Sequence, residues 1–220
     1  MEPEMAYYDI DDDMDLIEDF LEYVVQRVIV NCKTELEILE RDVTKLEKVK
    51  KPFPRITYDE AVEILRKKDI ALIRKTDHGE EHIRPFPWGE DFGAPHEEAI
   101  VEDYDKPVLV HRWPAEAKAF YMKRDPENPK ICLGVDVLAP EGFGEIIGGS
   151  QREDNLDLLL ERIEEHKLPV EVFDWEAIAK KIFIGFFAIS TLIILGFIAF
   201  VNFDSVEGIV TMSGAEGYLQ

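Results

Sequence analysis

The sequence predicts an α+β fold in which an antiparallel sheet lies among helices. Apolar residues recur at alternating steps of three and four from Met14 to Leu46, which is the spacing of one face of a helix. Between residues 106 and 149, short apolar runs are joined by tight connections, as in neighbouring antiparallel strands. With 220 residues and 46% hydrophobic content, the chain is long enough for one main domain with a sizeable core.

The N-terminal periodicity indicates one long amphipathic helix, with one break in the pattern around Cys32. Pro52 and Pro54 end this helix, because proline lacks the N–H that a helix interior needs. The acidic run "DIDDDMD" at its start supplies an N-cap and negative charge for the helix dipole. Metal binding is the less favoured interpretation of this run.

Short strands and helices follow in the rest of the domain. An extended piece, "RITY", leads into a second helix, which begins at a capping box of Thr57 and Glu60 and runs to about Lys68. Residues 69–87 carry no clear period. A short helix is predicted at "APHEEAIVEDY", strands at "KPVLVHRW", "EAKAFYMKR", "KICLGVDVL" and "GEIIGG", and a last helix at 154–166.

The charge balance is strongly acidic, with 47 acidic against 25 basic residues and a net charge of −22. Such a surface disfavours nonspecific attraction to nucleic acid over the whole molecule, because nucleic acid is also negatively charged. Any contact with RNA therefore has to be local.

The cysteines and histidines give no strong metal signal. Cys32 and Cys132 lie far apart with no CxxC spacing, which favours isolated core thiols in a reducing compartment over a disulfide or a zinc site. His111 follows Val110 in a predicted strand and is expected on the surface of the sheet. His96 is either a helix-start residue or a pocket residue.

A membrane-spanning segment is predicted near the C-terminus. Residues 182–201 contain no charge and match the ~20 residues needed to cross ~30 Å of hydrocarbon. The alternative is a buried core helix. A small acidic domain has little capacity to surround such a helix on all sides. Two lysines precede the segment and acids follow it, which places the N-terminal part in the cytoplasm. The expected division is a linker at 176–181, the span, and a tail at 202–220. The acidic start of the chain does not resemble an N-terminal signal.

A glycine-rich stretch, "EGFGEIIGGSQRE", contains a carboxylate that would repel a phosphate unless a metal ion stood between them. If this segment is a hairpin centred between residues 140 and 141, Asp136 and Glu145 lie opposite each other on one face. Opposed like charges are destabilising unless a divalent cation such as Mg²⁺ bridges them. Arg152 then grips a carboxylate or another acceptor on a second ligand. The alternative is a hairpin with two exposed acids and a surface arginine.

Several long blocks appear in the order and spacing of one known family. They are "PFPRITYDEAVEIL", "PWGEDFGAPHE", "KPVLVHRWPAEAKAFYMKRDPENP" and "VDVLAPEGFGEIIGGSQRE". Over residues 1–175 the chain resembles asparaginyl-tRNA synthetase, a class II synthetase related to the aspartyl enzymes, and "GEDFGAPHE" favours the asparaginyl branch. The resemblance implies a partial class II catalytic domain, an incomplete antiparallel sheet flanked by helices, followed by the predicted membrane helix.

The resemblance also implies ligands and site residues. ATP and Mg²⁺ are the implied cofactors, with Asp136 and Glu145 holding the metal and the ATP phosphates. Gly148 lies beside the metal and the amino acid, and Arg152 binds the amino acid, asparagine. Transfer RNA is the implied macromolecular substrate, and full-length members of the family form homodimers.

Weaker parts of the match add four residues. "EPEMAY" resembles the closing strand of the family's second signature motif, which implies that Glu2, with Glu4 beside it, belongs to an ATP-site strand. Lys118 and Tyr121 in "AKAFYM" are implied to line the amino-acid pocket.

Several family features have no counterpart in the sequence. The anticodon-binding barrel, the first motif, the arginine-bearing start of the second motif and the third motif are not recognised. Because motif arginines neutralise the triphosphate, the chain by itself is expected to be inactive. Two functions are weighed: part of the catalytic core of an asparagine–tRNA ligase, and a noncatalytic, membrane-anchored binding module.

Overall fold

The computed structural model describes residues 2–77 and 79–169. Residues 1–166 form one compact unit. The predicted membrane span at 182–201 lies outside the described residues, as do the linker before it and the tail after it. Within the part of the chain that is described, no helix is long and apolar enough to cross a membrane.

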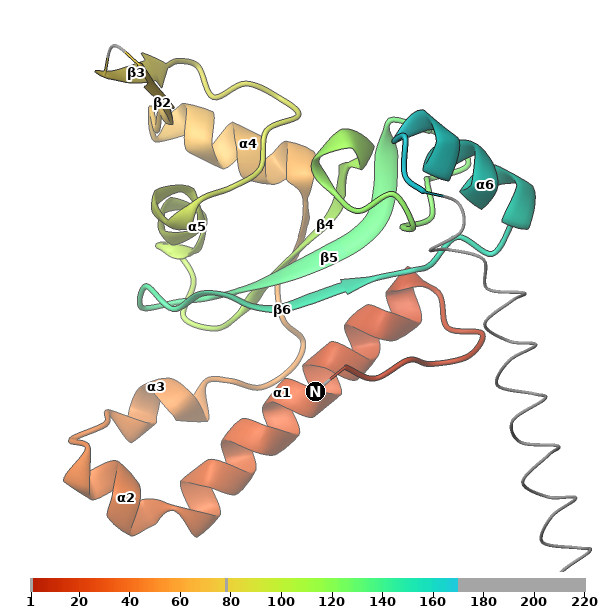
Figure 1. Ribbon diagram of the computed structural model, residues 1–220. Helices are drawn as coiled ribbons and strands as arrows, with labels where there is room; N and C mark the ends of the chain where they lie inside the picture. Colours follow the sequence, from red (N-terminus) through yellow and green to blue (C-terminus); the bar gives the residue numbers. More distant parts are fainter. Residues whose placement is uncertain (1, 78, 170–220) are drawn as a thin grey trace, which may run out of the picture. The chain divides into compact units, whose positions relative to one another are not determined.

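A four-stranded sheet forms the centre of the compact unit (Figure 1). Its strands lie in the order β1-β4-β5-β6, with the bounds Arg55–Thr57, Val108–Pro114, Ile131–Ala139 and Gly144–Ser150. The pairs β4–β5 and β5–β6 are antiparallel, as predicted, whereas β1 runs parallel to β4. The α+β class is therefore confirmed, and the parallel edge follows from the long crossover between β1 and β4, which contains two helices.

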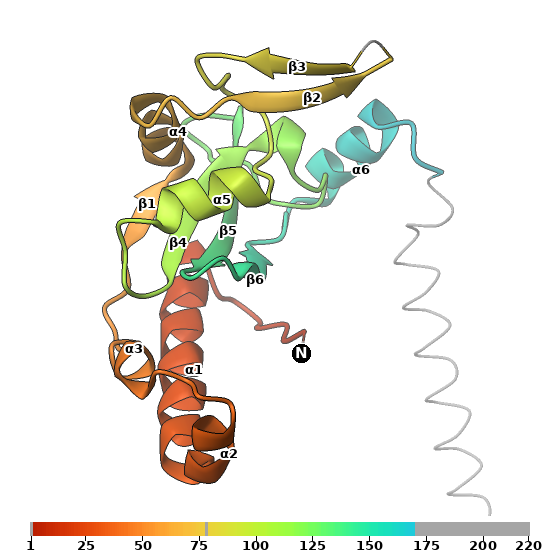
Figure 2. The same ribbon diagram turned by 90° about the vertical axis from the view of Figure 1, so that its left-hand side faces the viewer.

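The helices surround this sheet. They are α1 (Ile10–Asn31), α2 (Lys33–Ile38), α3 (Val43–Glu47), α4 (Tyr58–Lys67), α5 (Ala94–Val101) and α6 (Leu156–Glu165). A separate hairpin of β2 (Leu72–Thr76) and β3 (Gly79–Ile83) occupies the segment that showed no period, and Figure 2 shows it beyond α5. Its strands carry charged side chains on exposed surface, which explains why hydrophobic periodicity did not find them.

The prediction of one long N-terminal helix is wrong, because three helices share that segment. α1 ends at Asn31, and Cys32 has a non-helical backbone with φ −118° and ψ 37°. A second interruption follows α2, where Glu40 adopts a left-handed φ of 51°. The apolar spacing continued across both breaks because each of the first two helices still buries some of these residues, such as Met14 and Leu36.

Both predicted N-terminal caps are confirmed. The Asp9 side chain accepts hydrogen bonds from the N–H groups of Asp11 and Asp12 at the start of α1. The Thr57 hydroxyl accepts from the Glu60 N–H, and the Glu60 carboxylate accepts from the Thr57 N–H, which is the predicted capping box of α4.

Two hydrophobic cores lie on opposite faces of the sheet. Alternate residues of β5 divide between them: Leu133, Val135 and Val137 join the α1 core, whereas Cys132 and Leu138 join the core under α4 and α5. Figure 1 shows α1 on one side of the sheet and both α4 and α5 on the other. Because side chains alternate along β5, Asp136 lies on the same face as Cys132 and Leu138, which α4 and α5 cover only in part.

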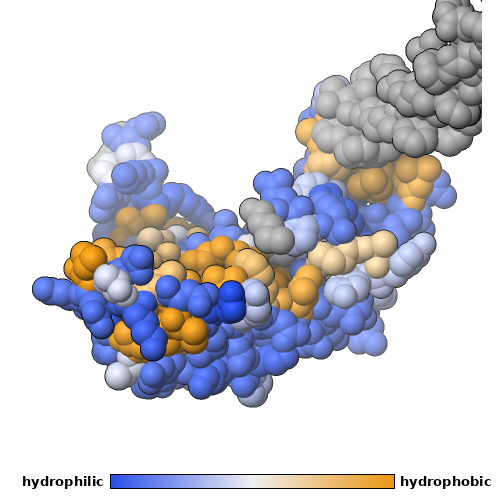
Figure 3. Space-filling view, turned by 90° about the horizontal axis from the view of Figure 1, so that it is seen from below, coloured by the Kyte–Doolittle hydropathy of each residue, from blue (hydrophilic) through white to orange (hydrophobic). Residues whose placement is uncertain are grey.

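The side of α1 that does not pack on the sheet is partly apolar. Its exposed large apolar side chains are Leu16, Phe20, Tyr23, Val24 and Val30, and α2 and the residue after it add Ile38 and Leu39. Figure 3 shows apolar surface interrupted by charged residues on the side where α1 and α2 lie.

Two further expectations are corrected. "EAKAFYMKR" is not a strand: after β4 the chain forms a short 3-10 turn, Ala115–Ala117, and then makes isolated bridges from Met122 to Arg152 and from Arg124 to Cys132. His111 is buried, with 9% of the residue exposed, and does not lie on an exposed sheet surface. Both cysteines are free thiols, with Cys132 buried and Cys32 only half-buried.

Candidate functional site

The predicted pairing of Asp136 with Glu145 is wrong in register. Asp136 lies opposite Gly148, and Glu145 lies opposite Leu138. The turn between the strands is four residues long, from Pro140 to Phe143, so the centre of the hairpin differs from the predicted one. The symmetric hairpin assumed from the sequence does not exist.

A β-bulge nevertheless returns Glu145 to the face of Asp136. The register shifts between the pair Val137–Ile147 and the pair Leu138–Glu145, which leaves Ile146 as the extra residue of β6. Without this shift Glu145 would point to the α1 side, because successive side chains alternate across a strand. With it, Glu145 faces the same side as Leu138 and Asp136.

Gly148 lies between the two carboxylates. A Cβ atom added at this position would lie 2.9 Å from Oε1 of Glu145 and 3.8 Å from Oδ1 of Asp136. Both carboxylates therefore converge on the space that the missing side chain leaves. The two acids lie on the same face of the sheet, as predicted, although the register from which this was predicted is wrong.

Lys118 supplies a positive charge beside Asp136. Its Nζ donates to Oδ2 of Asp136 at 2.6 Å, and Oδ1 of Asp91 lies 3.5 Å away. Burial raises the pKa of Asp136 to about 6, and although Lys118 opposes this shift, the negative charges of Glu145 and Asp91 add to it. Burial disfavours the charged form of Lys118, yet Asp136 and its acidic neighbours raise the pKa of the ammonium overall.

Trp113 fixes the position of Lys118. The lysine Nζ lies 3.8 Å from the ring centroid of Trp113, within the range of a cation–π contact. This ring joins the core under α4 and α5 because β4 and β5 change register between His111 and Trp113, where Arg112 has a left-handed φ of 60°. Two irregularities, one in β4 and one in β6 on the other side of β5, thus bring Trp113 and Glu145 to one face.

Replacing Lys118 with methionine is expected to destabilise the protein increasingly as the pH rises above about 6. The folded pKa of Asp136 already exceeds its unfolded value of 3.8, so this group costs stability as the pH rises between those values. Loss of the lysine raises the folded pKa further, and each additional unit costs about 1.4 kcal/mol at high pH. Urea unfolding from pH 5 to pH 8 measures the difference.

Lys123→Met is the matched control for that experiment. Lys123 pairs with Asp154 at 2.8 Å, and the Asp154 side chain is mostly exposed, so no buried charge is left behind. The destabilisation of Lys118→Met should grow between pH 6 and pH 8 while that of Lys123→Met stays constant. A constant difference for both variants would show that Lys118 does not neutralise Asp136.

Arg152 and Tyr121 form the second part of the candidate site. The guanidinium of Arg152 lies 4.8 Å from the ring centroid of Tyr121 and donates from Nε to the Glu4 carboxylate at 2.9 Å and from Nη2 at 2.5 Å. The hydrogen bond to Arg152 lowers the pKa of Glu4. Glu2 is exposed. The acid that pairs with Arg152 is Glu4, two residues further along the chain.

Sequence reasoning missed the role of Glu97 on α5. Its Oε2 accepts a hydrogen bond from the N–H of Glu145 at 3.2 Å and would lie 2.6 Å from a Cβ at Gly144, which has a left-handed φ of 68°. Glu97 thereby fixes the backbone of Glu145. The block "GEDFGAPHE" contained both Asp91 and Glu97 and was the available signal, since it places two acids around the start of a helix.

His96 has a structural role in the same block. Its Nδ1 accepts a hydrogen bond from the N–H of Gly93 at 2.9 Å, and its Nε2 lies 3.1 Å from the carbonyl oxygen of Ala71. The ring is buried against Phe86. The two alternatives for His96 are therefore decided in favour of a residue that fixes the helix start.

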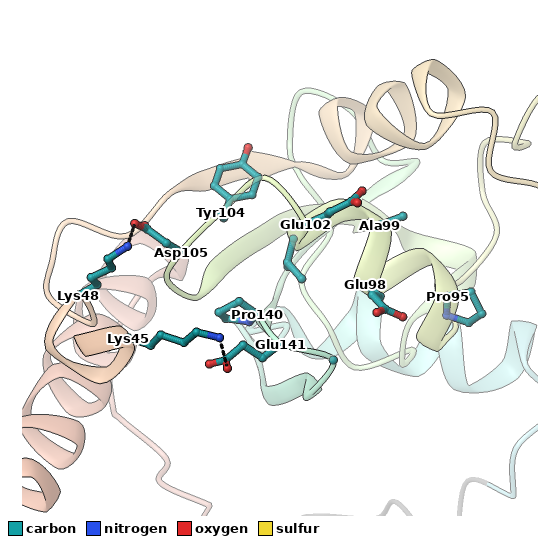
Figure 4. Close-up of a pocket in the computed structure, with 12 residues that line it drawn as sticks. Lys45, Lys48, Pro95, Glu98, Ala99, Glu102, Tyr104, Asp105, Pro140 and Glu141 are labelled. Atoms are coloured by element: carbon teal, nitrogen blue, oxygen red, sulfur yellow. Dashed lines mark hydrogen bonds and ion pairs between the residues drawn. The ribbon is translucent and has the colours of Figure 1, made fainter. Parts of the chain in front are cut away.

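A cavity of about 550 Å³ lies elsewhere, between α3, α5 and the β5–β6 turn (Figure 4). Both of its lining lysines are paired with lining acids: Lys45 contacts Glu141 at 2.8 Å, and Lys48 contacts Asp105 at 3.0 Å. Neither carboxylate of the Asp136–Glu145 pair lines it. The candidate site is therefore the open face around Gly148 and not this cavity.

The fold corresponds to a known class of protein. Residues 1–187 match the family model for tRNA synthetases class II (D, K and N). Because this match covers most of the chain, the protein belongs to that family.

Individual relatives are more specific. The chain is 57% identical over 175 residues to the asparagine–tRNA ligase of Sorangium cellulosum and 51% identical to that of Desulforamulus reducens, covering 80% of this chain in each case. Among solved structures, asparaginyl-tRNA synthetase from Pyrococcus horikoshii matches with a TM-score of 0.69 and 42% identity over 77% of this chain, and one of its structures contains asparaginyl-adenylate. The chain spans only 36–39% of the length of these relatives.

Proposed function

We propose that this chain forms part of the catalytic core of an asparagine–tRNA ligase, which activates asparagine with ATP and transfers it to tRNA. The observation that supports this most directly is the convergence of Asp136 and Glu145 beside Gly148, with Arg152 further along the same segment. Family membership alone gives the class of enzyme, and the asparagine–tRNA ligase relatives suggest the amino acid.

Asp136 and Glu145 are the proposed ligands of Mg²⁺ and neighbours of the ATP phosphates. Mg²⁺ prefers oxygen ligands and is usually held by one or two carboxylates together with water and substrate phosphates. The carboxylate pair supports this proposal because both side chains lie on one face of the sheet and approach the space beside Gly148. When bound, the metal would supply positive charge to the phosphates.

Arg152, Tyr121 and Lys118 are the proposed lining of the amino-acid pocket. A guanidinium binds a carboxylate or amide oxygen with two parallel hydrogen bonds, and Arg152 already holds the Glu4 carboxylate in this way. Tyr121 lies against the guanidinium and restricts its movement. The chemistry is attack of the asparagine carboxylate on the α-phosphate of ATP, which forms the adenylate, breaks the bond between the α- and β-phosphates and releases pyrophosphate. These residues orient the amino acid for that attack.

The proposal predicts asparagine-dependent ATP–pyrophosphate exchange in a protein that joins this chain to the segments that its asparagine–tRNA ligase relatives carry. Arg152→Ala is expected to lower that exchange by about 10²–10³, because an uncharged side chain cannot replace a preorganised donor. Asparagine binding to the 220-residue chain, measured by calorimetry with aspartate as the comparison, tests the pocket directly.

Arg124→Ala is the matched control, since Arg124 lies in the same region and pairs with Glu165 of α6. Exchange should be retained in this variant. If the joined protein activates no amino acid while the chain still binds a ligand or partner, the noncatalytic binding module is the better description.

A further inference from the structure

Arg162 is a buried arginine that the proposed chemistry does not use. It lies on α6, and only 5% of the residue is exposed. Its Nη1 donates to the carbonyl oxygen of Met122 at 2.8 Å and lies 3.4 Å from that of Phe120, and its Nη2 donates to the Glu153 carboxylate at 2.6 Å. One guanidinium therefore joins three residues from two chain segments.

These three residues are the immediate neighbours of the proposed pocket residues. Phe120 and Met122 flank Tyr121 on both sides, and Glu153 directly follows Arg152. The two segments also pair through their backbones: Met122 bridges to Arg152, and the Glu153 N–H donates to the Tyr121 carbonyl at 2.9 Å. Arg162 thus contacts the residues on both sides of Tyr121 and the residue that follows Arg152.

Stability alone is a poor explanation for this arrangement. The Arg162 and Glu153 side chains are 7% and 3% exposed, and removing two charges from water costs roughly as much as their attraction returns. Apolar side chains of similar volume would fill the space at no greater cost. What the guanidinium adds is directional: its planar donors fix two carbonyls and one carboxylate at set angles.

We propose that Arg162 is a positioning residue that sets the placement of Arg152 and Tyr121. It acts from beneath the pocket, through the backbone of residues 120–122 and through Glu153. This inference rests on the proposed function for its consequence on asparagine binding. Its structural part, the placement of the Arg152 side chain against Glu4 and Tyr121, stands independently.

The test uses a variant in which both buried charges are removed, Arg162→Met with Glu153→Met. This pair avoids leaving one buried charge without a partner, which would unfold the protein for a reason unrelated to the pocket. Arg124→Met is the matched control, because Arg124 also pairs with α6 but contacts it through Glu165. Cooperative urea unfolding first establishes that each variant is folded.

The first measurement follows the Nε–H signal of Arg152 by NMR in the 220-residue chain, with Arg152→Lys to identify the signal and Glu4→Gln to show its position without the ion pair. In the double variant we expect the signal to move to the Glu4→Gln position, while Arg124→Met leaves it unchanged. A signal at the wild-type position in the folded double variant overturns the proposal.

The second measurement is asparagine affinity in the same proteins. Displacement of a binding group by about 1 Å can cost on the order of 100-fold, so we expect a loss of about 10- to 100-fold in the double variant and a smaller loss for Arg162→Lys, which keeps one charge but not the planar donors. Wild-type affinity in the double variant overturns the proposal. If the wild-type chain binds no asparagine, the proposed function fails for this chain, and the NMR measurement still decides the placement of Arg152.

Discussion

Replacing Trp113 with alanine is expected to lower the free energy of unfolding by about 3–5 kcal/mol, as for other fully buried tryptophans. The ring is almost completely buried and packs against Phe92 and Tyr58, with ring centroids 4.8 and 5.1 Å away. Its Nε1 also donates to the Val110 carbonyl at 2.9 Å, so the substitution leaves a cavity and an unpaired acceptor. Urea unfolding monitored by far-UV circular dichroism measures the loss.

Trp88→Ala provides the comparison. Trp88 is 44% exposed, and its contacts are a hydrogen bond to Asp59 and an edge contact with Tyr58, so a loss of about 1 kcal/mol is expected. Similar losses in the two variants would contradict the burial and packing assigned to Trp113. The Trp113→Ala substitution would also displace Lys118, because the lysine ammonium lies on the ring that is removed.

Gly148→Ala is expected to weaken Mg²⁺-dependent ATP binding while the protein remains folded. The new Cβ would lie 2.9 Å from Oε1 of Glu145, closer than two such atoms can approach, and the flexible end of the glutamate is what has to move. Gly148 does not have a left-handed backbone, so alanine itself is tolerated. Displacing one of the two proposed carboxylate ligands should weaken binding by about 10- to 100-fold, measured by calorimetry with ATP and Mg²⁺ on the joined protein.

Gly93→Ala is the control for this substitution. A Cβ there meets only Nδ1 of His96 at 3.8 Å, an ordinary contact. Unchanged ATP binding in Gly148→Ala would show that the Glu145 carboxylate does not hold the metal, and loss of ATP binding in both variants would point to a general effect of losing glycine.

The sequence predicted the presence of helices and strands better than the residues at which they begin and end. Strong local signals were correct: the capping box at Thr57, the N-cap at Asp9, and the strands β4, β5 and β6. The single long helix failed because apolar spacing does not show a backbone turn such as that at Glu40. The β2–β3 hairpin was missed because its strands bury almost nothing, so they have no hydrophobic alternation to detect.

The site was predicted in outline and not in geometry. That Asp136 and Glu145 converge was correct, but the assumed register was wrong, because a bulge at Ile146 and not symmetry about the turn brings them together. A bulge adds one residue without a distinctive side chain, so it leaves no trace in the sequence. For the same reason, the sequence did not show that Trp113 belongs to the site. Trp113 reaches this face of the sheet through the change of register at Arg112.

The ion pair between Arg152 and Glu4 has a consequence for the order of folding. These residues are 148 positions apart, whereas only four residues separate the strands of the β5–β6 hairpin. Closing the longer loop from the unfolded chain costs about 3 kcal/mol more entropy, and contacts of high sequence separation form late in folding. We therefore expect the hairpin that holds Asp136 and Glu145 to form early, and docking of the N-terminal segment onto Arg152 to complete the site last.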